Sequence, residues 1–359
     1  MGKFLAEIRK DLKAYVPGEQ PQDRSYIKLN TNESPFPPSP AVAEAAKKEA
    51  GKLQLYSDPE SRELTALAAE LYGVEPGQVL MTNGSDEILN FAFMAFCGPD
   101  QGAAFPDITY GFYSVFGDLH HVPYEQIPLK EDYSIDYRDY CGIHKTIFIA
   151  NPNAPTGLIL SNEEIEEILK SNPDNVVIID EAYADFAGQS CLPLLSKYDN
   201  LLITRTFSKS YSMAGARLGL GIGSEDLIRD LNTIKYSTNP YNVNRMTAAA
   251  GAAALRDNDY YMSNCRVICE NREFTRESLK KLGFTVLPSH SNFLFAKTEQ
   301  AEGQALYEGL KERGILVRHF GGERVKDFIR VTIGTREQME AFLSAPKCLT
   351  RIPLSFKPS

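Results

Sequence analysis

The sequence lacks the features that mark membrane, secreted and nucleic-acid-binding proteins. Its longest apolar stretches are only as long as a strand, so no membrane span is expected. Residues 1–15 are charged and amphipathic, and they lack the apolar region of a signal peptide. The net charge of −9, with no run of Lys and Arg, argues against a nucleic-acid surface. We therefore expect a globular protein that has neither nucleic acid nor membrane as a partner.

Cysteine is also sparse, and its spacing follows no known pattern. The chain has six cysteines and no CxxC pair. Cys265 and Cys269 are one helical turn apart, but no second Cys or His pair completes a zinc site. We predict buried thiols in a reducing cytoplasm rather than disulfides or metal ligands.

The elements that are present alternate between strands and helices. A chain of 359 residues is too long for one small core and predicts a large domain with a smaller one. Apolar strands are expected at 79–82, 146–150, 176–180 and 201–206, with helices at 41–50, 61–71 and 87–96. This alternation predicts an α/β fold with a mostly parallel sheet and helices on both faces.

A group of prolines and a change in the pattern of strands and helices predict the domain boundaries. Four prolines (35, 37, 38 and 40) exclude regular structure around that point, so residues 1–40 are expected to form an N-terminal helix and an extended arm. The large domain is expected at 41–245. A small α+β domain follows at 246–345, with strands at 285–287, 293–296, 315–318 and 329–333. Residues 346–359 are expected to be an irregular tail.

The segment 201–223 carries the strongest chemical signal. An apolar strand ends in hydroxyl residues around Lys209, flanked by Ser208 and Ser210, and Arg217 follows among small residues. Lysine amines attack carbonyls when their surroundings lower the pKa. The segment therefore indicates a Schiff-base lysine, with Ser208 and Arg217 available to a phosphate. A strand followed by a solvated loop is the alternative.

Three further polar motifs follow expected strands. Residues 82–86 form a glycine turn into a helix, which is an anion site or an ordinary capped turn. Residues 151–157, Asn-Pro-Asn-Ala-Pro-Thr-Gly, are rigid and polar. Asp180 ends the third strand and is either a ligand of the site or a helix cap. Ligands of open parallel sheets bind beyond these carboxyl ends, so the motifs are expected to meet.

In this order, the motifs resemble the pyridoxal-phosphate-dependent aminotransferases of fold type I. The resemblance covers residues 15–344, nearly the whole chain. It implies a seven-stranded, mostly parallel sheet flanked by helices and a smaller α+β domain. It also implies pyridoxal 5′-phosphate as cofactor and a homodimer with a shared active site.

The resemblance gives each motif residue a role. Lys209 would hold the cofactor aldehyde and move the proton in the 1,3-shift. Asp180 would pair with the ring nitrogen, so that the ring acts as an electron sink, and Tyr183 would hydrogen-bond the phenolic oxygen. Among the other implied cofactor contacts, Tyr110 would stack on the ring and Tyr56 would reach a phosphate across the dimer interface. The phosphate would be held by Gly84, Ser85, Asp86, Ser208 and Arg217.

One position departs from the family pattern. Many relatives have asparagine immediately before Pro-Thr-Gly, where it contacts the ring oxygen, but this chain has Ala154 there and Asn153 one residue earlier. Either Asn153 reaches the ring from a shifted loop or Tyr183 makes that contact alone. We expect Asn153 to make it.

Within the fold, the chain is most similar to the histidinol-phosphate aminotransferases, on residues 29–35, 83–87 and 328–335. That resemblance implies transfer of an amino group from histidinol phosphate to 2-oxoglutarate in histidine biosynthesis. Arg330 and Arg318 would take the substrate phosphate, with Tyr15 and Asn292 as further contacts; a surface charge is the alternative for Arg318. Threonine-phosphate decarboxylase, an aromatic aminotransferase and a non-catalytic cofactor-binding regulatory module are the alternative functions.

Overall fold

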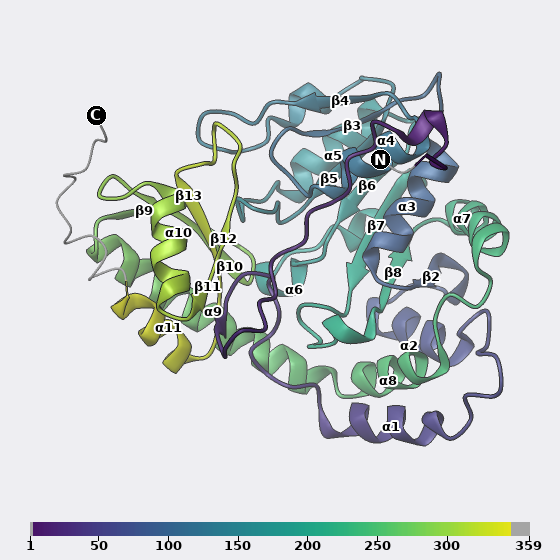
Figure 1. Ribbon diagram of the computed structural model, residues 1–359. Helices are drawn as coiled ribbons and strands as arrows, with labels where there is room; N and C mark the ends of the chain where they lie inside the picture. The colour runs from purple at the N-terminus through teal and green to yellow at the C-terminus, as the bar shows by residue number, and fades with distance from the viewer. Residues whose placement is uncertain (1–2, 346–359) are drawn as a thin grey trace.

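The computed structural model describes residues 3–345, and the expected tail at 346–359 lies outside them. A large body is built around a seven-stranded sheet, and a smaller body lies beside it (Figure 1). The strands of the large sheet are β2 (Val79–Thr82), β3 (Ala103–Pro106), β4 (Tyr124–Ile127), β5 (Thr146–Ala150), β6 (Val177–Asp180), β7 (Leu201–Thr206) and β8 (Gly219–Ile222).

The large sheet has the strand order β2-β8-β7-β6-β5-β3-β4. Neighbouring strands from β7 to β4 run parallel, whereas β8 is antiparallel to both β2 and β7. The carboxyl ends of β2, β3, β5, β6 and β7 therefore lie at the same edge. The predicted α/β fold with a mostly parallel seven-stranded sheet is confirmed.

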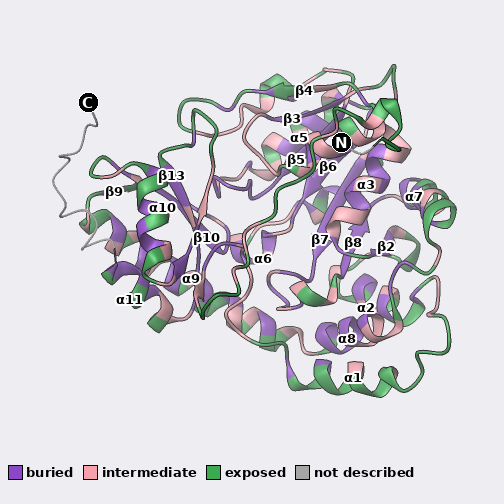
Figure 2. Ribbon diagram, viewed as in Figure 1, coloured by how far each residue is buried: buried purple, intermediate pink, exposed green. Residues whose placement is uncertain are grey.

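Helices cover both faces of the large sheet because alternate strand residues point to opposite sides. Ile147 and Ile149 of β5 face one apolar core, while Phe148 faces the other. Figure 2 shows the strands buried between helices whose outer surfaces are exposed. The first core is covered by α1 (Pro40–Ala50), α2 (Arg62–Tyr72), α5 (Asn162–Ser171) and α8 (Arg245–Arg256), and the second by α3 (Ser85–Phe96), α4 (Phe112–His120) and α7 (Glu225–Thr238).

The small body contains a four-stranded antiparallel sheet of order β12-β13-β10-β9. Its predicted α+β character is confirmed. The strand expected at 315–318 is divided into two short strands that belong to different sheets. The remaining elements are α6 (Ala184–Ala187), α9 (Asn258–Lys281), α10 (Gly303–Glu312), α11 (Arg336–Ser344), β9 (Phe284–Val286), β10 (Phe293–Thr298), β11 (Ile315–Leu316), β12 (Arg318–His319) and β13 (Phe328–Thr332).

We propose a boundary between the two bodies that lies later than the expected residue 245. Helix α8 packs into the core of the large body, and Tyr261 of α9 still belongs to that core. Cys265, one turn further along α9, already belongs to the core of the small body. We therefore propose that the chain passes from one body to the other within α9.

The N-terminal segment runs between the two bodies (Figure 1). Strand β1 (Ile27–Lys28) pairs in parallel with β11 and so ties the segment to the small body. The helix expected within residues 1–15 is not found among the described residues, which form only the 3₁₀ turn Glu7–Arg9. Phe4 and Ile8 are 90% and 65% exposed. A short amphipathic helix is not stable without a partner for its apolar face.

Among residues 3–345, no helix is both long and apolar enough to cross a bilayer.

Candidate active site

Polar residues at the carboxyl ends of β6 and β7 meet in one cavity of about 440 Å³. Asp180 is the last residue of β6 and Thr206 the last of β7, and Lys209 follows three residues later. We call this space the lysine cavity. Its lining includes Gln20, Thr31, Glu33, Ser85, Asp86, Tyr110, Ala154, Asp180, Tyr183, Ser208, Lys209 and Arg217.

The amine of Lys209 is held in a setting that favours its neutral form. Its Nζ donates a hydrogen bond to the Thr31 carbonyl oxygen at 3.2 Å. The pKa of Lys209 is lowered to about 8, mainly by burial. The positive charge of Arg330 also lowers this pKa, and its effect is larger than the opposing effect of the Glu33 carboxylate. With this pKa the amine is still mostly protonated at neutral pH, but its neutral, nucleophilic fraction is far larger than that of an ordinary lysine.

Asp180 is buried but well supplied with hydrogen-bond donors. Its Oδ1 accepts from the Thr204 hydroxyl at 3.0 Å and from the Ala182 N–H at 3.2 Å, and its Oδ2 accepts from the Tyr113 hydroxyl at 3.2 Å. Burial raises the pKa of Asp180 to about 6, while these hydrogen bonds act in the opposite direction. The carboxylate is thus mostly ionised at neutral pH and can hold a cationic group.

The N-terminus of α3 forms one wall of the lysine cavity. Ser85 and Asp86 are its first residues, and their free N–H groups favour an anion. The Arg217 guanidinium lies across this end and donates from Nη2 to Asp86 Oδ2 at 3.0 Å and from Nη1 to Ser208 Oγ at 3.5 Å. Gly84 has φ +79°, and a Cβ there would lie 2.6 Å from Arg217 Nη2. The predicted phosphate residues are therefore brought together.

Two of the predicted tyrosines, Tyr110 and Tyr183, lie on the walls of the lysine cavity. Tyr110 donates its hydroxyl proton to Asp86 Oδ1 at 2.6 Å. The hydroxyl oxygen of Tyr183 accepts a hydrogen bond from the Asn32 amide at 2.8 Å. Burial raises the pKa of Tyr183, so its hydroxyl keeps its proton and remains a donor.

Asn153 does not lie as we expected. Its Oδ1 accepts from the Thr109 hydroxyl at 2.7 Å, and its Nδ2 donates to the Ile108 carbonyl at 3.0 Å and to Thr156 Oγ1 at 3.1 Å. The side chain is 1% exposed and does not line the cavity, whereas Ala154 does. Both N–H groups of the amide are used in holding its own loop, so the structure does not support the expected contact of Asn153 with the cofactor.

A second cavity, of about 370 Å³, continues from the first. We call it the arginine cavity, because Arg318 and Arg330 both line it, together with Tyr15. It shares Thr31, Tyr110, Ala154, Tyr183 and Lys209 with the lysine cavity. The three substrate residues predicted at this end are therefore brought within one space beside the lysine.

The two arginines have no carboxylate partner within the described part of the chain. Arg330 donates from Nη2 to the Asn30 carbonyl at 3.0 Å, and its buried Nε has no hydrogen-bond partner. Arg318 donates to the carbonyl oxygens of Pro17 and Val16 at 3.0 and 2.9 Å. Burial lowers the pKa of Arg330, and the positive charge of Arg318 acts in the same direction. Two adjacent, uncompensated cations form a site for an anion.

Asn292 and Tyr56 line neither cavity, and the same is true of Gly84 and Asn153. Asn292 is fully buried and donates from Nδ2 to the Asn32 carbonyl at 3.0 Å, so it supports the residue that holds Tyr183. A direct contact between Asn292 and substrate stays a prediction. Tyr56 is 79% exposed on the surface of its own chain.

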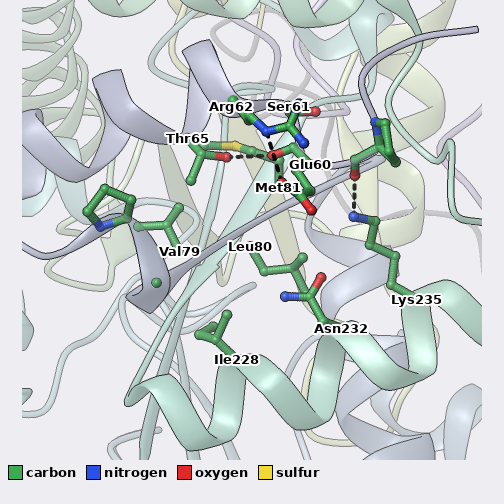
Figure 3. A pocket seen from close by; sticks show the side chains of 13 residues that line it. Glu60, Ser61, Arg62, Thr65, Val79, Leu80, Met81, Ile228, Asn232 and Lys235 are labelled. Carbon is green, nitrogen blue, oxygen red and sulfur yellow. Dashed lines mark hydrogen bonds and ion pairs between the residues drawn. The ribbon is translucent and has the colours of Figure 1, made fainter.

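A comparison with Lys235, a second lysine in a cavity, shows how the surroundings of Lys209 differ. Lys235 of α7 is 2% exposed, and Figure 3 shows it in a different cavity, of about 310 Å³, with Asn232, Ile228 and Leu80. Burial also lowers the pKa of Lys235. Its amine, however, donates to the Pro59 carbonyl, and no aspartate at the end of a strand lines this cavity.

Sequence reasoning missed several residues that support the site. Thr204 and Tyr113 hold Asp180, and Asn32 holds Tyr183. Thr204 could have been predicted, because alternate residues of a strand lie on the same face and Thr204 lies two residues before Thr206 in β7. Likewise, Tyr113 lies one helical turn after Tyr110.

Comparison with known proteins places this site in a family. The model of class I and II aminotransferases matches residues 24–345. A histidinol-phosphate aminotransferase of Brachyspira hyodysenteriae is 48% identical over 98% of this chain and 100% of its own length. One from Clostridium acetobutylicum is 46% identical over 97% of this chain and 99% of its own.

A solved structure agrees in fold. The histidinol-phosphate aminotransferase of Sinorhizobium meliloti, described as a complex with pyridoxal-5′-phosphate, superposes with a TM-score of 0.88 at 23% identity and covers 98% of both chains. The chain described here belongs to the class I and II aminotransferases, enzymes that use pyridoxal 5′-phosphate as their cofactor.

Proposed function

We propose that this chain transfers the amino group of histidinol phosphate to 2-oxoglutarate, giving imidazole-acetol phosphate and glutamate. The observation that carries the proposal is the pair Arg318 and Arg330, uncompensated in a cavity that opens onto Lys209. A phosphate dianion balances two such charges better than a single carboxylate does. The identity of 44–48% with full-length enzymes of that name supports the same substrate.

The residues of the lysine cavity fit pyridoxal phosphate. The N-terminus of α3, Ser208 and Arg217 would hold its phosphate, and Asp180 its protonated ring nitrogen. Tyr183 would donate to its phenolic oxygen, and Tyr110 lies on the wall where the ring face would be covered. When bound, the cofactor supplies an electron sink for the charge that proton removal leaves on the substrate carbon.

The protein's own groups perform the rest of the chemistry. Lys209 can take and return a proton near neutral pH, because burial lowers its pKa to about 8. Thr204 and Tyr113 keep Asp180 in the ionised form by donating to it. Arg318 and Arg330 bind the substrate phosphate and so fix the distance of the amine from Lys209.

The first test is a substrate panel with 2-oxoglutarate as acceptor. Histidinol phosphate is expected to yield glutamate, and tyrosine to be a poor donor. Threonine phosphate is expected to release no carbon dioxide. Carbon dioxide from threonine phosphate, with no glutamate from histidinol phosphate, would identify a decarboxylase instead. Fast turnover of tyrosine alone would identify an aromatic aminotransferase.

Replacing Arg330 with methionine is expected to raise the KM for histidinol phosphate by about 10- to 100-fold, the value of one or two charge-assisted hydrogen bonds. Methionine preserves much of the side-chain volume but removes the charge. Steady-state kinetics provide the measurement. Arg313→Met is the matched control, because Arg313 donates only to the Gly309 carbonyl of its own helix. Equal KM values for the two variants would contradict the assignment of Arg330.

Cofactor capture by the cofactor-free protein is expected to become faster with rising pH, with a midpoint of about 8 rather than near the usual lysine value. The sign follows because only the neutral amine of Lys209 attacks an aldehyde, and it predominates above its pKa. Stopped-flow appearance of the visible absorption band provides the measurement.

Two variants should move this midpoint in opposite directions. Arg330→Met removes a positive charge that lowers the pKa of Lys209, so the midpoint rises. Glu33→Gln removes a negative charge that raises it, so the midpoint falls. A midpoint that is the same in both variants would show that another group controls capture.

We also propose that the active site is completed by a second copy of the chain. Tyr56 stacks on Tyr241 at 4.5 Å, and Leu53, Leu55 and Tyr236 are also exposed. Exposed aromatic and aliphatic side chains are typical of interfaces. The family resemblance assigns Tyr56 to a phosphate of the other subunit. Light scattering of the purified chain tests the dimer, and a monomer at the concentration of the assay would contradict it.

The cytoplasm is the compartment that we propose for this reaction. Five described cysteines, at positions 97, 141, 191, 265 and 269, are free thiols, as expected in a reducing environment. Fractionation of the native host, with the protein located by antibody, is the measurement, and recovery outside the cytoplasm would contradict the proposal.

A further inference from the structure

A buried cluster of charges lies beside the active site but outside both cavities. Arg205 of β7 is paired through Nη2 with Glu181 Oε2 at 2.8 Å and through Nη1 with Asp185 Oδ1 at 2.7 Å. The side chains of Arg205 and Glu181 are 7% and 1% exposed. We call Arg205, Glu181 and Asp185 the charge cluster. None of the three lines the lysine cavity or the arginine cavity.

The position of Arg205 in its strand explains why it is separate from the site. Thr204 and Thr206 point to the face that carries Asp180 and Ser208. Arg205, between them, points to the opposite face, where its guanidinium lies 5.2 Å from the centre of the Tyr72 ring. A buried ion cluster is costly, and apolar residues of similar size often serve stability as well or better. Stability alone therefore does not explain the presence of the charge cluster.

One hydrogen bond connects the charge cluster to the catalytic segment. Ser210 donates its hydroxyl proton to Asp185 Oδ2 at 2.5 Å. Asp185 thus holds Arg205 with one oxygen and Ser210 with the other. Ser210 is 3% exposed and is the residue directly after Lys209.

The residue before Lys209 is held in a similar way. The Ser208 N–H donates to Thr206 Oγ1 at 3.1 Å, and the Thr206 hydroxyl donates to Ser208 Oγ at 3.0 Å. Lys209 therefore lies between two serines, one tied to the end of β7 and the other to the charge cluster behind the sheet. Its side chain is long and flexible, so the backbone on both sides limits where Nζ can go.

We propose that Ser210 and Asp185 are positioning residues that fix the backbone of Lys209, and that Arg205 and Glu181 hold Asp185 in place for this purpose. The proposal rests on the proposed function, in which Lys209 is the proton-transfer group. A displacement of about 1 Å at a reacting group can cost about a hundredfold in rate, so one such hydrogen bond can have a measurable effect on turnover.

The test compares three variants of the cofactor-loaded protein. Ser210→Ala removes only the bond to Asp185, and it is expected to lower kcat about tenfold or more while KM for histidinol phosphate stays unchanged. Ser210→Thr retains the hydroxyl and is expected to restore most of the loss. Ser190→Ala is the matched control, because Ser190 donates to Glu181 Oε2 at 2.7 Å on the other side of the cluster. It is expected to retain the wild-type kcat.

A second readout does not depend on turnover. The cofactor-free proteins are treated with a trace of labelled acetic anhydride, and the acylation rate of Lys209 relative to Lys235 is determined by peptide mass spectrometry. Ser210→Ala is expected to change this ratio, and Ser190→Ala to leave it as in the wild type. A purely structural role would lower the melting temperature in both variants and change neither kcat nor the ratio.

The outcomes separate this proposal from the proposed function. If wild-type protein forms no glutamate from histidinol phosphate, the proposed function fails and the acylation ratio alone tests the positioning role. If wild-type protein is active and Ser210→Ala equals Ser190→Ala in both kcat and acylation ratio, the positioning proposal is overturned. Equal loss in Ser210→Ala and Ser210→Thr would also overturn it, because the hydroxyl would then be irrelevant.

Discussion

Replacing Lys209 with alanine is expected to lower the rate of glutamate formation by about 10⁴-fold or more. The variant loses both the amine that captures the cofactor and the group that moves the substrate proton, and proton transfer alone typically contributes about 10²- to 10⁴-fold. The visible absorption band of the bound cofactor should be lost or shifted as well. Steady-state assay and absorption spectroscopy of the purified variant provide the two measurements.

Lys235→Ala is the matched control for this variant. Lys235 is buried, and burial lowers its pKa too, but its amine is bound to the Pro59 carbonyl in another cavity. The control is expected to lose stability through the unpaired carbonyl, while the cofactor band and the turnover of the folded fraction are retained. Full turnover in Lys209→Ala would refute the assignment of Lys209.

Asp180→Asn is expected to lower kcat by about 10²- to 10³-fold, the effect of removing one preorganised charge from an active site. Asparagine has nearly the same shape, and its amide oxygen can still accept from Thr204 and the Ala182 N–H, but an NH2 group replaces the oxygen that accepts from Tyr113, and the side chain is neutral. It therefore cannot hold the cofactor's ring nitrogen in its protonated form, and the electron sink is weakened. Stopped-flow measurement of the first half-reaction isolates this effect from product release.

The loss of kcat is expected to depend on the charge of Asp180 rather than on its packing. Thr204→Val removes one of the hydrogen bonds to Asp180 and leaves the carboxylate in place, so it is expected to cost about tenfold or less. Asp180→Asn and Thr204→Val with equal kcat would indicate that Asp180 acts only by packing. The amount of bound phosphate, measured on both variants, controls for loss of cofactor.

The sequence allowed prediction of those features that depend on order along the chain. Asp180 ends one apolar strand and Lys209 follows another, and the parallel sheet brings such strand ends to one edge. The glycine turn before α3 and Arg217 were found for the same reason. Each has a local signal that does not depend on the rest of the fold.

Features that depend on side-chain direction could not be predicted in this way. Asn153 and Ala154 are neighbours in one loop, and only three-dimensional packing decides that the alanine faces the cavity. Arg205 has no sequence signal either, since a charged residue in an apolar strand has a role only when its partners are known. The N-terminal helix was expected from an amphipathic pattern, but the described residues offer its apolar face no partner to pack against.

The central claim is that Lys209 is the residue that binds the cofactor, and reduction with borohydride tests it most directly. The loaded protein is treated with borohydride, digested and mapped by mass spectrometry. The account predicts that the visible band disappears and that the pyridoxyl group is found on the peptide that contains Lys209. The same group on Lys235 or another lysine, with Lys209 unmodified, would contradict the account.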